Sequence, residues 1–336
     1  MCCLYGILDY KQNLTNWQKN HLLRKLSIAS EKRGTDATGI AYNHRGRMEI
    51  HKKPVPAHNF HQRIPHGVNV VLGHTRLTTQ GNEKINRNNH PFKGYCYEMP
   101  FALAHNGVLY NEMKLRREFE LPATSIETDS YVAVQMIEKI GAFDLKAIQT
   151  MAESVEGSFC FTLLDKDDNI YLVKGNNPLT IYHFEKLGIF VYASTEEILK
   201  KGLQKAGWGL YQYQEVDIKM GDILILKADG QIIRETFNTR KLDAYEPFWY
   251  GSSWGRPYGY SVDEPVFRQK KRSHRSYEYG TYLESIVDYA ANVGISEWEI
   301  MYLFENGFEE EEIEALLYSP EILREYIDEM IEAEYA

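Results

Sequence analysis

The chain begins with MCCLYGILDY (residues 1–10), in which two cysteines stand directly before a run of apolar residues. A short apolar run with aromatic members predicts a β-strand, whose successive side chains point to opposite faces. If Met1 is removed, Cys2 carries a free α-amine beside its thiol, and an α-amine of pKa about 7.7–8.0 is partly unprotonated near neutral pH. Cys2 is therefore predicted to be a nucleophile that carries its own base. The alternative is that Cys2 and Cys3 are small apolar residues of a first strand.

The composition predicts a large hydrophobic core, because 43% of the 336 residues are hydrophobic. No stretch approaches the roughly 20 apolar residues of a membrane span, and the start lacks the pattern of a signal peptide. Four cysteines are too few for a disulfide framework in a chain of this size. They are Cys2, Cys3, Cys96 and Cys160. We therefore expect a reduced, cytoplasmic setting without membrane attachment.

The charge is divided unevenly along the chain. Residues 276–336 hold 17 acidic residues and one basic residue, Arg324, whereas residues 1–275 hold 30 acidic and 37 basic residues. Such a split favours an acidic interaction tail or a separate helical unit over nucleic-acid binding. We interpret the basic run FRQKKRSHR (267–275) as a solvated linker in preference to a nucleic-acid patch.

Strand-like and helix-like segments alternate in groups up to about residue 240. The strand-like runs are CLYGIL, TGIAY, VNVVLGHT, FALAHNG, SFCFTLL, NIYLV, GIFVYAS and GDILIL. Turn sequences join the last strands as hairpins, at DKDDN (165–169) and KADGQ (227–231). Helices are predicted at 16–32, 128–140, 143–154 and 195–204, with Thr128 and Ser194 as N-caps. This order favours antiparallel sheets flanked by helices.

The strand pattern stops near residue 240, and three regions are predicted from there. Residues 2–240 form the main domain, 241–276 an aromatic, Gly-rich and basic linker, and 277–336 an acidic helical unit. Within that unit, Ser296 and Glu299 predict a capping box and Gly307 a helix end. The acidic unit is either a docking module for a partner or a helical cap on the main domain.

Three further stretches carry candidate site residues. FALAHNGVLYN (101–111) offers the Asn106 side-chain amide and the Gly107 N–H as an oxyanion hole, with an ordinary Asn-Gly turn as the alternative. LGHTRLTTQGN (72–82) offers Arg76 for a bidentate grip on a carboxylate, with a surface salt bridge as the alternative. ETDSYVAVQMIE (127–138) offers Asp129 for a substrate ammonium, or simply as a first-turn acid of a helix.

Taken in order, these motifs resemble the class II glutamine amidotransferase domain of the amino-terminal nucleophile hydrolase type, over roughly residues 2–235. The motifs that carry the resemblance are Cys2, RGTDATGIA (33–41), GHTRLTTQGN (73–82), HPF (90–92), HNGVLYN (105–111), ETDS (127–130) and YASTEEIL (192–199). The resemblance implies an α+β fold, a four-layer αββα sandwich of two antiparallel sheets. It also implies hydrolysis of L-glutamine to glutamate and ammonia, without a metal or another cofactor.

The resemblance also implies roles for individual residues. Cys2 is the nucleophile and its α-amine the base, while Asn106 and Gly107 form the oxyanion hole. Arg76 binds the glutamine carboxylate and Asp129 its ammonium, with Thr79 at the substrate. Supporting positions behind the site are implied for five residues: Arg33, Gly34, Asp36, His74 and His105.

Three functions remain open from the sequence. Only 96 residues follow residue 240, too few for the synthase domains that well-known relatives carry, so a stand-alone glutaminase would feed a separate synthase. A second possibility is a hydrolase of another γ-glutamyl amide. A third is a catalytically silent binding or assembly protein with the same fold.

Overall fold

The computed structural model describes residues 2–97, 99–243 and most of 286–335. The chain divides into two compact units, residues 1–247 and 248–336. Each unit is described by itself, because the position of one relative to the other is not determined. The predicted linker 241–276, apart from its first three residues, and Gly307 lie outside the described residues.

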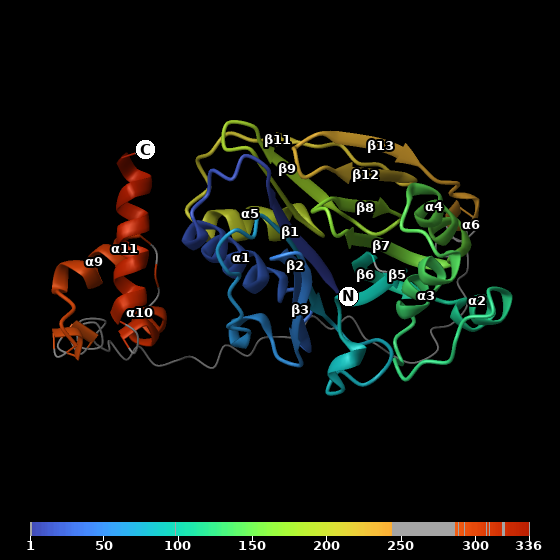
Figure 1. Cartoon of the computed structure of the whole chain (residues 1–336), viewed down its shortest axis with the longest axis horizontal. Coiled ribbons are helices and arrows are strands. Elements are labelled where there is room, and N and C mark those ends of the chain that lie inside the picture. The colour runs from blue at the N-terminus through green and yellow to red at the C-terminus, as the bar shows by residue number, and fades with distance from the viewer. Residues whose placement is uncertain are drawn as a thin grey trace, which may run out of the picture. The chain divides into compact units, whose positions relative to one another are not determined.

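The first unit is built on two antiparallel sheets, which lie face to face (Figure 1). The seven strands of the first sheet run in the order β11 (Gln214–Glu215), β9 (Thr180–Phe184), β10 (Ile189–Ala193), β1 (Cys3–Asp9), β4 (Val70–Arg76), β2 (Ala37–His44) and β3 (Arg47–Lys53). The six strands of the second run in the order β13 (Ile232–Thr236), β12 (Asp222–Leu226), β8 (Ile170–Lys174), β7 (Gly157–Leu164), β6 (Met99–Leu109) and β5 (Phe92–Cys96).

Helices cover the outer face of each sheet. On the first sheet lie α1 (Asn16–Ser30) and α5 (Glu196–Lys205), and on the second lie α2 (Glu112–Glu118), α3 (Tyr131–Ile140) and α4 (Leu145–Ser154). Short helical turns complete the unit at η1 (Ala57–Asn59), η2 (Asn86–Asn88) and α6 (Arg240–Asp243). Three separate cores fill the spaces between these four layers. The predicted four-layer αββα sandwich is therefore confirmed.

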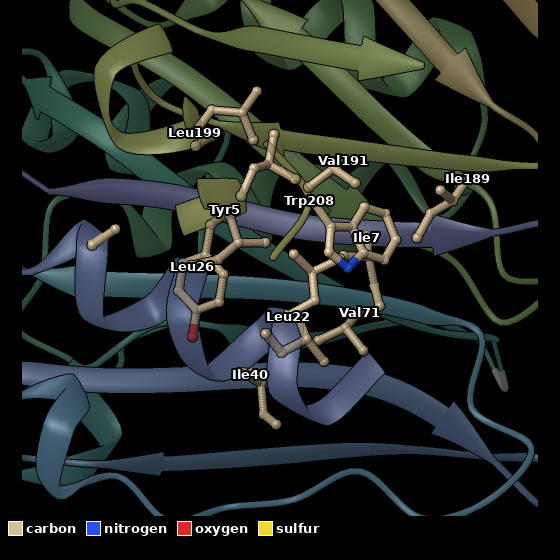
Figure 2. Close-up of a cluster of buried hydrophobic side chains, with 14 of the residues drawn as sticks. Tyr5, Ile7, Leu22, Leu26, Ile40, Val71, Ile189, Val191, Leu199 and Trp208 are labelled. Carbon is tan, nitrogen blue, oxygen red and sulfur yellow. The ribbon is translucent and has the colours of Figure 1, made fainter. Parts of the chain in front are cut away.

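The central strand β1 is buried on both faces, and its residues alternate between two of the cores. Cys3, Tyr5 and Ile7 pack beneath α1 and α5, as Figure 2 shows for Tyr5 and Ile7 beside side chains from α1 and α5. Leu4 and Leu8 face the other way, into the core between the sheets. This alternation of period two decides which cysteine can face the second sheet.

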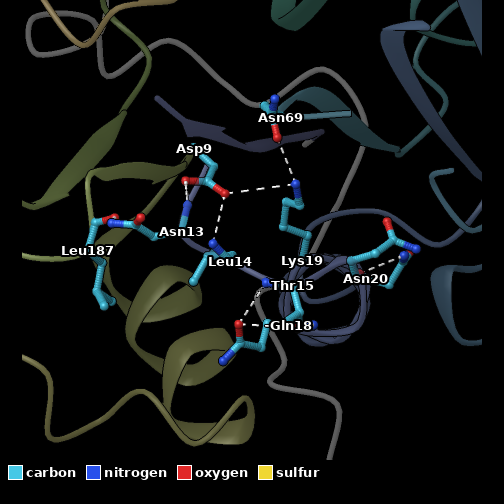
Figure 3. A network of polar contacts seen from close by, with 10 residues as sticks. Asp9, Asn13, Leu14, Thr15, Gln18, Lys19, Asn20, Asn69 and Leu187 are labelled. Carbon is cyan, nitrogen blue, oxygen red and sulfur yellow. Dashed lines mark hydrogen bonds and ion pairs between the residues drawn. The ribbon is translucent and has the colours of Figure 1, made fainter. Parts of the chain in front are cut away.

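A polar network closes the turn between β1 and α1 (Figure 3). The buried Asp9 carboxylate accepts hydrogen bonds from the backbone N–H groups of Asn13 and Leu14, each at 3.2 Å. Lys19 lies 3.8 Å from the same carboxylate and donates to Asn69 Oδ1 at 2.7 Å. Burial raises the pKa of Asp9, while these N–H groups and Lys19 oppose that rise. The network fixes the far end of the strand that begins beside Cys2.

Two predicted helix caps are wrong. Thr195, and not Ser194, caps α5 by accepting a hydrogen bond from the Ile198 N–H. Thr128 does not cap α3 but donates from Oγ1 to the Asn88 carbonyl oxygen at 2.8 Å. In both cases the hydroxyl group of the predicted cap makes a contact with a residue distant in sequence.

The second unit contains α9 (Glu297–Glu305), α10 (Glu310–Leu317) and α11 (Pro320–Tyr335). The predicted capping box is confirmed, because Glu299 accepts from the Ser296 N–H at 2.7 Å and its own N–H donates to Ser296 Oγ at 3.3 Å. Among the described residues of both units, no helix is long and apolar enough to cross a membrane.

Candidate active site

The candidate nucleophile lies at the start of the central strand of the first sheet. Cys2 is 8% exposed, and its Sγ lies 3.5 Å from the Leu77 carbonyl oxygen, just beyond β4. Burial raises the pKa of the Cys2 thiol, the positive charge of Arg76 opposes this rise and the negative charge of Asp129 reinforces it. Two segments far from Cys2 in the sequence therefore act electrostatically on its thiol.

The Asn106–Gly107 pair lies inside a strand. Both residues belong to β6, so the alternative of an ordinary Asn-Gly turn is wrong. The Asn106 side chain is fully buried, and its Nδ2 lies 3.4 Å from Ser194 Oγ. Gly107 has a φ of 149°, and a Cβ atom there would lie 1.8 Å from the Ser158 carbonyl oxygen. Only glycine fits this backbone, whose N–H is one of the two predicted oxyanion donors.

Arg76 ends β4 with a buried guanidinium. The residue is 2% exposed, so the alternative of a surface salt bridge is wrong. Its Nη1 donates to Asn89 Oδ1 at 2.6 Å, and its Nη2 donates to the Gln80 carbonyl oxygen. Burial lowers the pKa of Arg76, and negative charges that include Glu83 oppose that effect. These two hydrogen bonds fix the orientation of the guanidinium, so that it is preorganised to bind a planar anion such as a carboxylate.

Asp129 and Thr79 differ in how they are placed. Asp129 is buried, and its Oδ2 accepts from the Leu109 N–H at 2.6 Å, at the end of β6. It precedes Ser130, the residue before α3, so it is not a first-turn acid of that helix. Thr79 is exposed on the loop that follows β4. The carboxylate is therefore tied to the strand of Asn106, and the threonine lies at the rim.

The predicted supporting motif contacts the backbone on two sides of the site. Arg33 Nε donates to the Cys2 carbonyl oxygen at 2.8 Å. The Asp36 N–H donates to the Arg76 carbonyl oxygen at 2.9 Å, and Asp36 Oδ2 accepts from the Thr78 N–H at 2.7 Å. A Cβ atom on Gly34 would lie 2.4 Å from the Arg76 carbonyl carbon. The motif therefore joins the nucleophile to the end of β4.

Buried histidines lie behind the site. His74 Nε2 contacts the His105 carbonyl oxygen at 3.0 Å, and His105 Nδ1 contacts Ser130 Oγ at 2.7 Å. Burial lowers the pKa of His74 to about 3 and that of His105 to about 4. Both rings are therefore neutral near pH 7. A neutral ring of such low pKa is better suited to holding neighbouring groups in place by hydrogen bonds than to transferring protons. In the described part of the chain, no group of three or more His, Cys, Asp or Glu residues could hold a metal ion.

Sequence reasoning missed four residues that contact this site, and they come from three segments of the chain. His90 packs on His74 with ring centroids 4.3 Å apart, and Asn89 accepts from Arg76. Asn177 donates to the Asn106 carbonyl oxygen at 2.7 Å, and Ser194 contacts the Asn106 side chain. His90 and Ser194 stand inside motifs that the sequence marks, HPF and YASTEEIL, but nothing in the sequence indicates their contacts.

Comparisons with known proteins identify the kind of domain. Residues 74–201 match a family model described as a glutamine amidotransferase domain. Among the relatives, glutamine–fructose-6-phosphate aminotransferase (isomerizing) of Halalkalibacterium halodurans is 30% identical over 255 residues, and that of Staphylococcus aureus is 27% identical over 259 residues. Each alignment covers 73% of this chain and 40% of the relative, so the chain spans less than half the length of these proteins.

Solved structures share the fold. Glutamine phosphoribosylpyrophosphate amidotransferase from B. subtilis, complexed with ADP and GMP, superposes with a TM-score of 0.55 at 22% identity. The allosteric regulatory enzyme of purine biosynthesis superposes with a TM-score of 0.56 at 21% identity. Each match covers 71% of this chain and 50% of the other.

Proposed function

The chain contains a class II glutamine amidotransferase domain of the amino-terminal nucleophile hydrolase type, and from this premise we propose that it hydrolyses L-glutamine to glutamate and ammonia through Cys2. The observation that carries the proposal is that Arg76 and Asp129 are both buried and that the charges of both act on the thiol of Cys2, whose Sγ lies 3.5 Å from the carbonyl oxygen of Leu77, the neighbour of Arg76. A buried cation and a buried anion that both act on one nucleophile match the carboxylate and ammonium of an amino acid.

The chemistry needs one nucleophile, one base and two oxyanion donors. With Met1 removed, the α-amine of Cys2 takes the thiol proton, and Sγ attacks the side-chain carbonyl carbon of glutamine. The negative oxygen of the tetrahedral intermediate is stabilised by the Asn106 amide and the Gly107 N–H. The protonated amine gives its proton to the leaving nitrogen, which departs as ammonia. Water then attacks the thioester, and glutamate is released from the restored thiol.

The decisive experiment measures glutamate and ammonia released from L-glutamine by the purified chain and by Cys2→Ala. We expect turnover by the unaltered protein, no turnover by Cys2→Ala, and glutamine binding by both in calorimetry. A protein that binds glutamine without turnover would support the catalytically silent alternative. Rapid hydrolysis of a larger γ-glutamyl amide, with glutamine left intact, would support the second enzyme alternative.

The use of the ammonia is a separate part of the proposal. We propose that a synthase on another chain consumes it, and that the acidic unit 277–336 recruits this partner. The support is electrostatic: 17 acidic residues against one basic residue in 276–336 favour docking on a basic surface. Glutaminase activity that rises when a co-purifying protein is added would support the partner. Equal activity with and without every co-purifying protein would contradict it.

A further inference from the structure

One hydroxyl group touches both the strand of the nucleophile and the predicted oxyanion donor. Ser194 follows β10 and is fully buried. Its Oγ accepts from the Leu4 N–H at 2.8 Å, and its own N–H donates to the Leu4 carbonyl oxygen at 2.9 Å. The same Oγ lies 3.4 Å from Asn106 Nδ2, on the second sheet. Ser194 therefore joins the two sheets at a point two residues from Cys2.

The Nδ2 end of the Asn106 side-chain amide contacts Ser194, whereas the Oδ1 end has no hydrogen-bond partner among the described residues. Asn177 fixes the backbone by donating to the Asn106 carbonyl oxygen at 2.7 Å. Asn106 Oδ1 is buried and has no hydrogen-bond partner among the described residues. A buried acceptor without a partner is unfavourable, and a half-turn of the amide would satisfy it while leaving the NH2 group for another acceptor, such as the substrate oxygen.

The two ends of an amide are nearly the same shape, and its hydrogen bonds decide which end faces which neighbour. A half-turn of the Asn106 amide brings the unsatisfied Oδ1 to Ser194. A serine hydroxyl has one hydrogen to donate and two lone pairs, one of which already accepts from Leu4. The hydroxyl can therefore donate to Oδ1, and both Nδ2 hydrogens then face away from Ser194.

We propose that Ser194 is a positioning residue for the oxyanion hole, because its hydroxyl decides which end of the Asn106 amide faces the substrate oxygen. The inference rests on the proposed function of Cys2 and Asn106. In the half-turned orientation Ser194 holds the acceptor end, and the donor end is free for the tetrahedral intermediate. The 3.4 Å separation is long for a hydrogen bond, as catalytic contacts often are before substrate binds.

The test compares turnover with a reaction of Cys2 that needs no oxyanion. In the full chain, Ser194→Ala is expected to lower kcat for glutamine by about tenfold or more, with KM changed less than about threefold. Alkylation of Cys2 by iodoacetamide displaces iodide and forms no oxyanion, so its rate should change less than about twofold. Ser194→Thr keeps a hydroxyl and should recover most of kcat. Ser125→Ala, at an exposed serine, is the surface control.

A double-mutant cycle with Asn106→Ala distinguishes a Ser194 that positions the Asn106 amide from a Ser194 that only stabilises the fold. If Ser194 acts through Asn106, Ser194→Ala should cause almost no further loss in the Asn106→Ala background. A full further loss overturns the proposal, and so does a parallel fall of kcat and alkylation rate. If Ser194→Ala does not fold, Ser194→Cys replaces it, since a thiol is a weak donor of similar size.

The positioning role of Ser194 can be tested even if the protein does not hydrolyse glutamine. In that case the unaltered chain releases no glutamate, and the Asn106 side-chain ¹⁵N resonance is measured instead. We expect this resonance to shift in Ser194→Ala and not in Ser125→Ala. An unchanged resonance would overturn the inference independently of turnover.

Discussion

Arg33 donates from Nε to the backbone carbonyl oxygen of Cys2 at 2.8 Å, across 31 positions of sequence. The contact holds the backbone immediately beside the thiol, whose Sγ contacts the Leu77 carbonyl oxygen at 3.5 Å. Asp36 makes two similar contacts with the segment that leaves β4. The motif therefore sets the distance between the nucleophile and the Arg76 segment, which predicts that small changes within it alter activity.

Gly34→Ala should impair both stability and turnover, because the added methyl group would lie 2.4 Å from the Arg76 carbonyl carbon. Relief requires a backbone shift, for which a loss of about 1–3 kcal/mol in the free energy of unfolding is typical. Gly209→Ala is the matched control, since the first neighbour of its added methyl group would lie 3.5 Å away. Urea unfolding and glutamine kinetics test both variants. Equal effects at the two glycines would contradict the close approach.

The purified protein should lack Met1, and a glutamine-like electrophile should label Cys2 and spare Cys3. Cys3 is fully buried and faces the core beneath α1, whereas Cys2 is 8% exposed beside Leu77. Intact-mass measurement followed by peptide mapping tests both points. An active enzyme that retains Met1, or label on Cys3, would exclude the amine-as-base mechanism.

Arg76→Lys should lower kcat/KM for glutamine by roughly ten- to a hundredfold, although the charge is kept. A lysine cannot reproduce a two-pronged hydrogen bond, and one charge-assisted hydrogen bond is worth about 1.5–3 kcal/mol. Arg117→Lys, at an exposed arginine of α2, is the control for the exchange itself. Unchanged kinetics in Arg76→Lys would move the carboxylate site elsewhere.

Stability should fall as the pH is lowered from about 7.5 to 5.5. The folded-state pKa values of His74 and His105 are about 3 and about 4, and that of His90 is well below its ordinary value. In the unfolded chain a histidine binds a proton near pH 6.5, so acid favours unfolding by about 1 kcal/mol for each of these residues over this interval. Urea unfolding at several pH values measures the slope. His74→Gln should reduce it by about a third, and a flat profile in the unaltered protein would refute the expectation.

A chain ending at Asp243 should fold and hydrolyse glutamine, whereas one ending at Thr239 should be less stable. The expected boundary at residue 240 falls at the start of α6, and Leu242 of that helix is buried in the core of the second sheet. Loss of one buried leucine costs about 2–5 kcal/mol. Leu242→Ala in the full chain isolates this contribution, and thermal unfolding compares all three proteins. Aggregation of the chain ending at Asp243 would assign the following aromatic run to the catalytic domain.

The order of the motifs predicts the four-layer fold, which the structure confirms, whereas the roles of the residues around Cys2 remain predictions. Edge strand β3 is missing from the predicted strands because Met48 and Ile50 are its only apolar residues, and β11 is missing because it consists of two exposed polar residues. Local propensity predicts Thr128 and Ser194 as helix caps. Their hydroxyl groups contact Asn88 and Leu4, which lie 40 and 190 positions away. No local pattern can predict such contacts, since they exist only once the sheets have assembled.

Because successive side chains of β1 point to opposite faces, the position at which the chain starts decides which face its first side chain takes. A protease that removed one residue too many would still leave an amino-terminal cysteine, with the same thiol and the same amine. That thiol would belong to Cys3, whose side chain lies among the apolar residues beneath α1. Such a protein would be indistinguishable from the active form by end-group analysis, yet its nucleophile would face away from Asn106. Removal of Met1 alone is therefore required. Removal of one residue more would expose the amine and thiol of Cys3, which has the same chemistry as Cys2 but a side chain on the other face of β1.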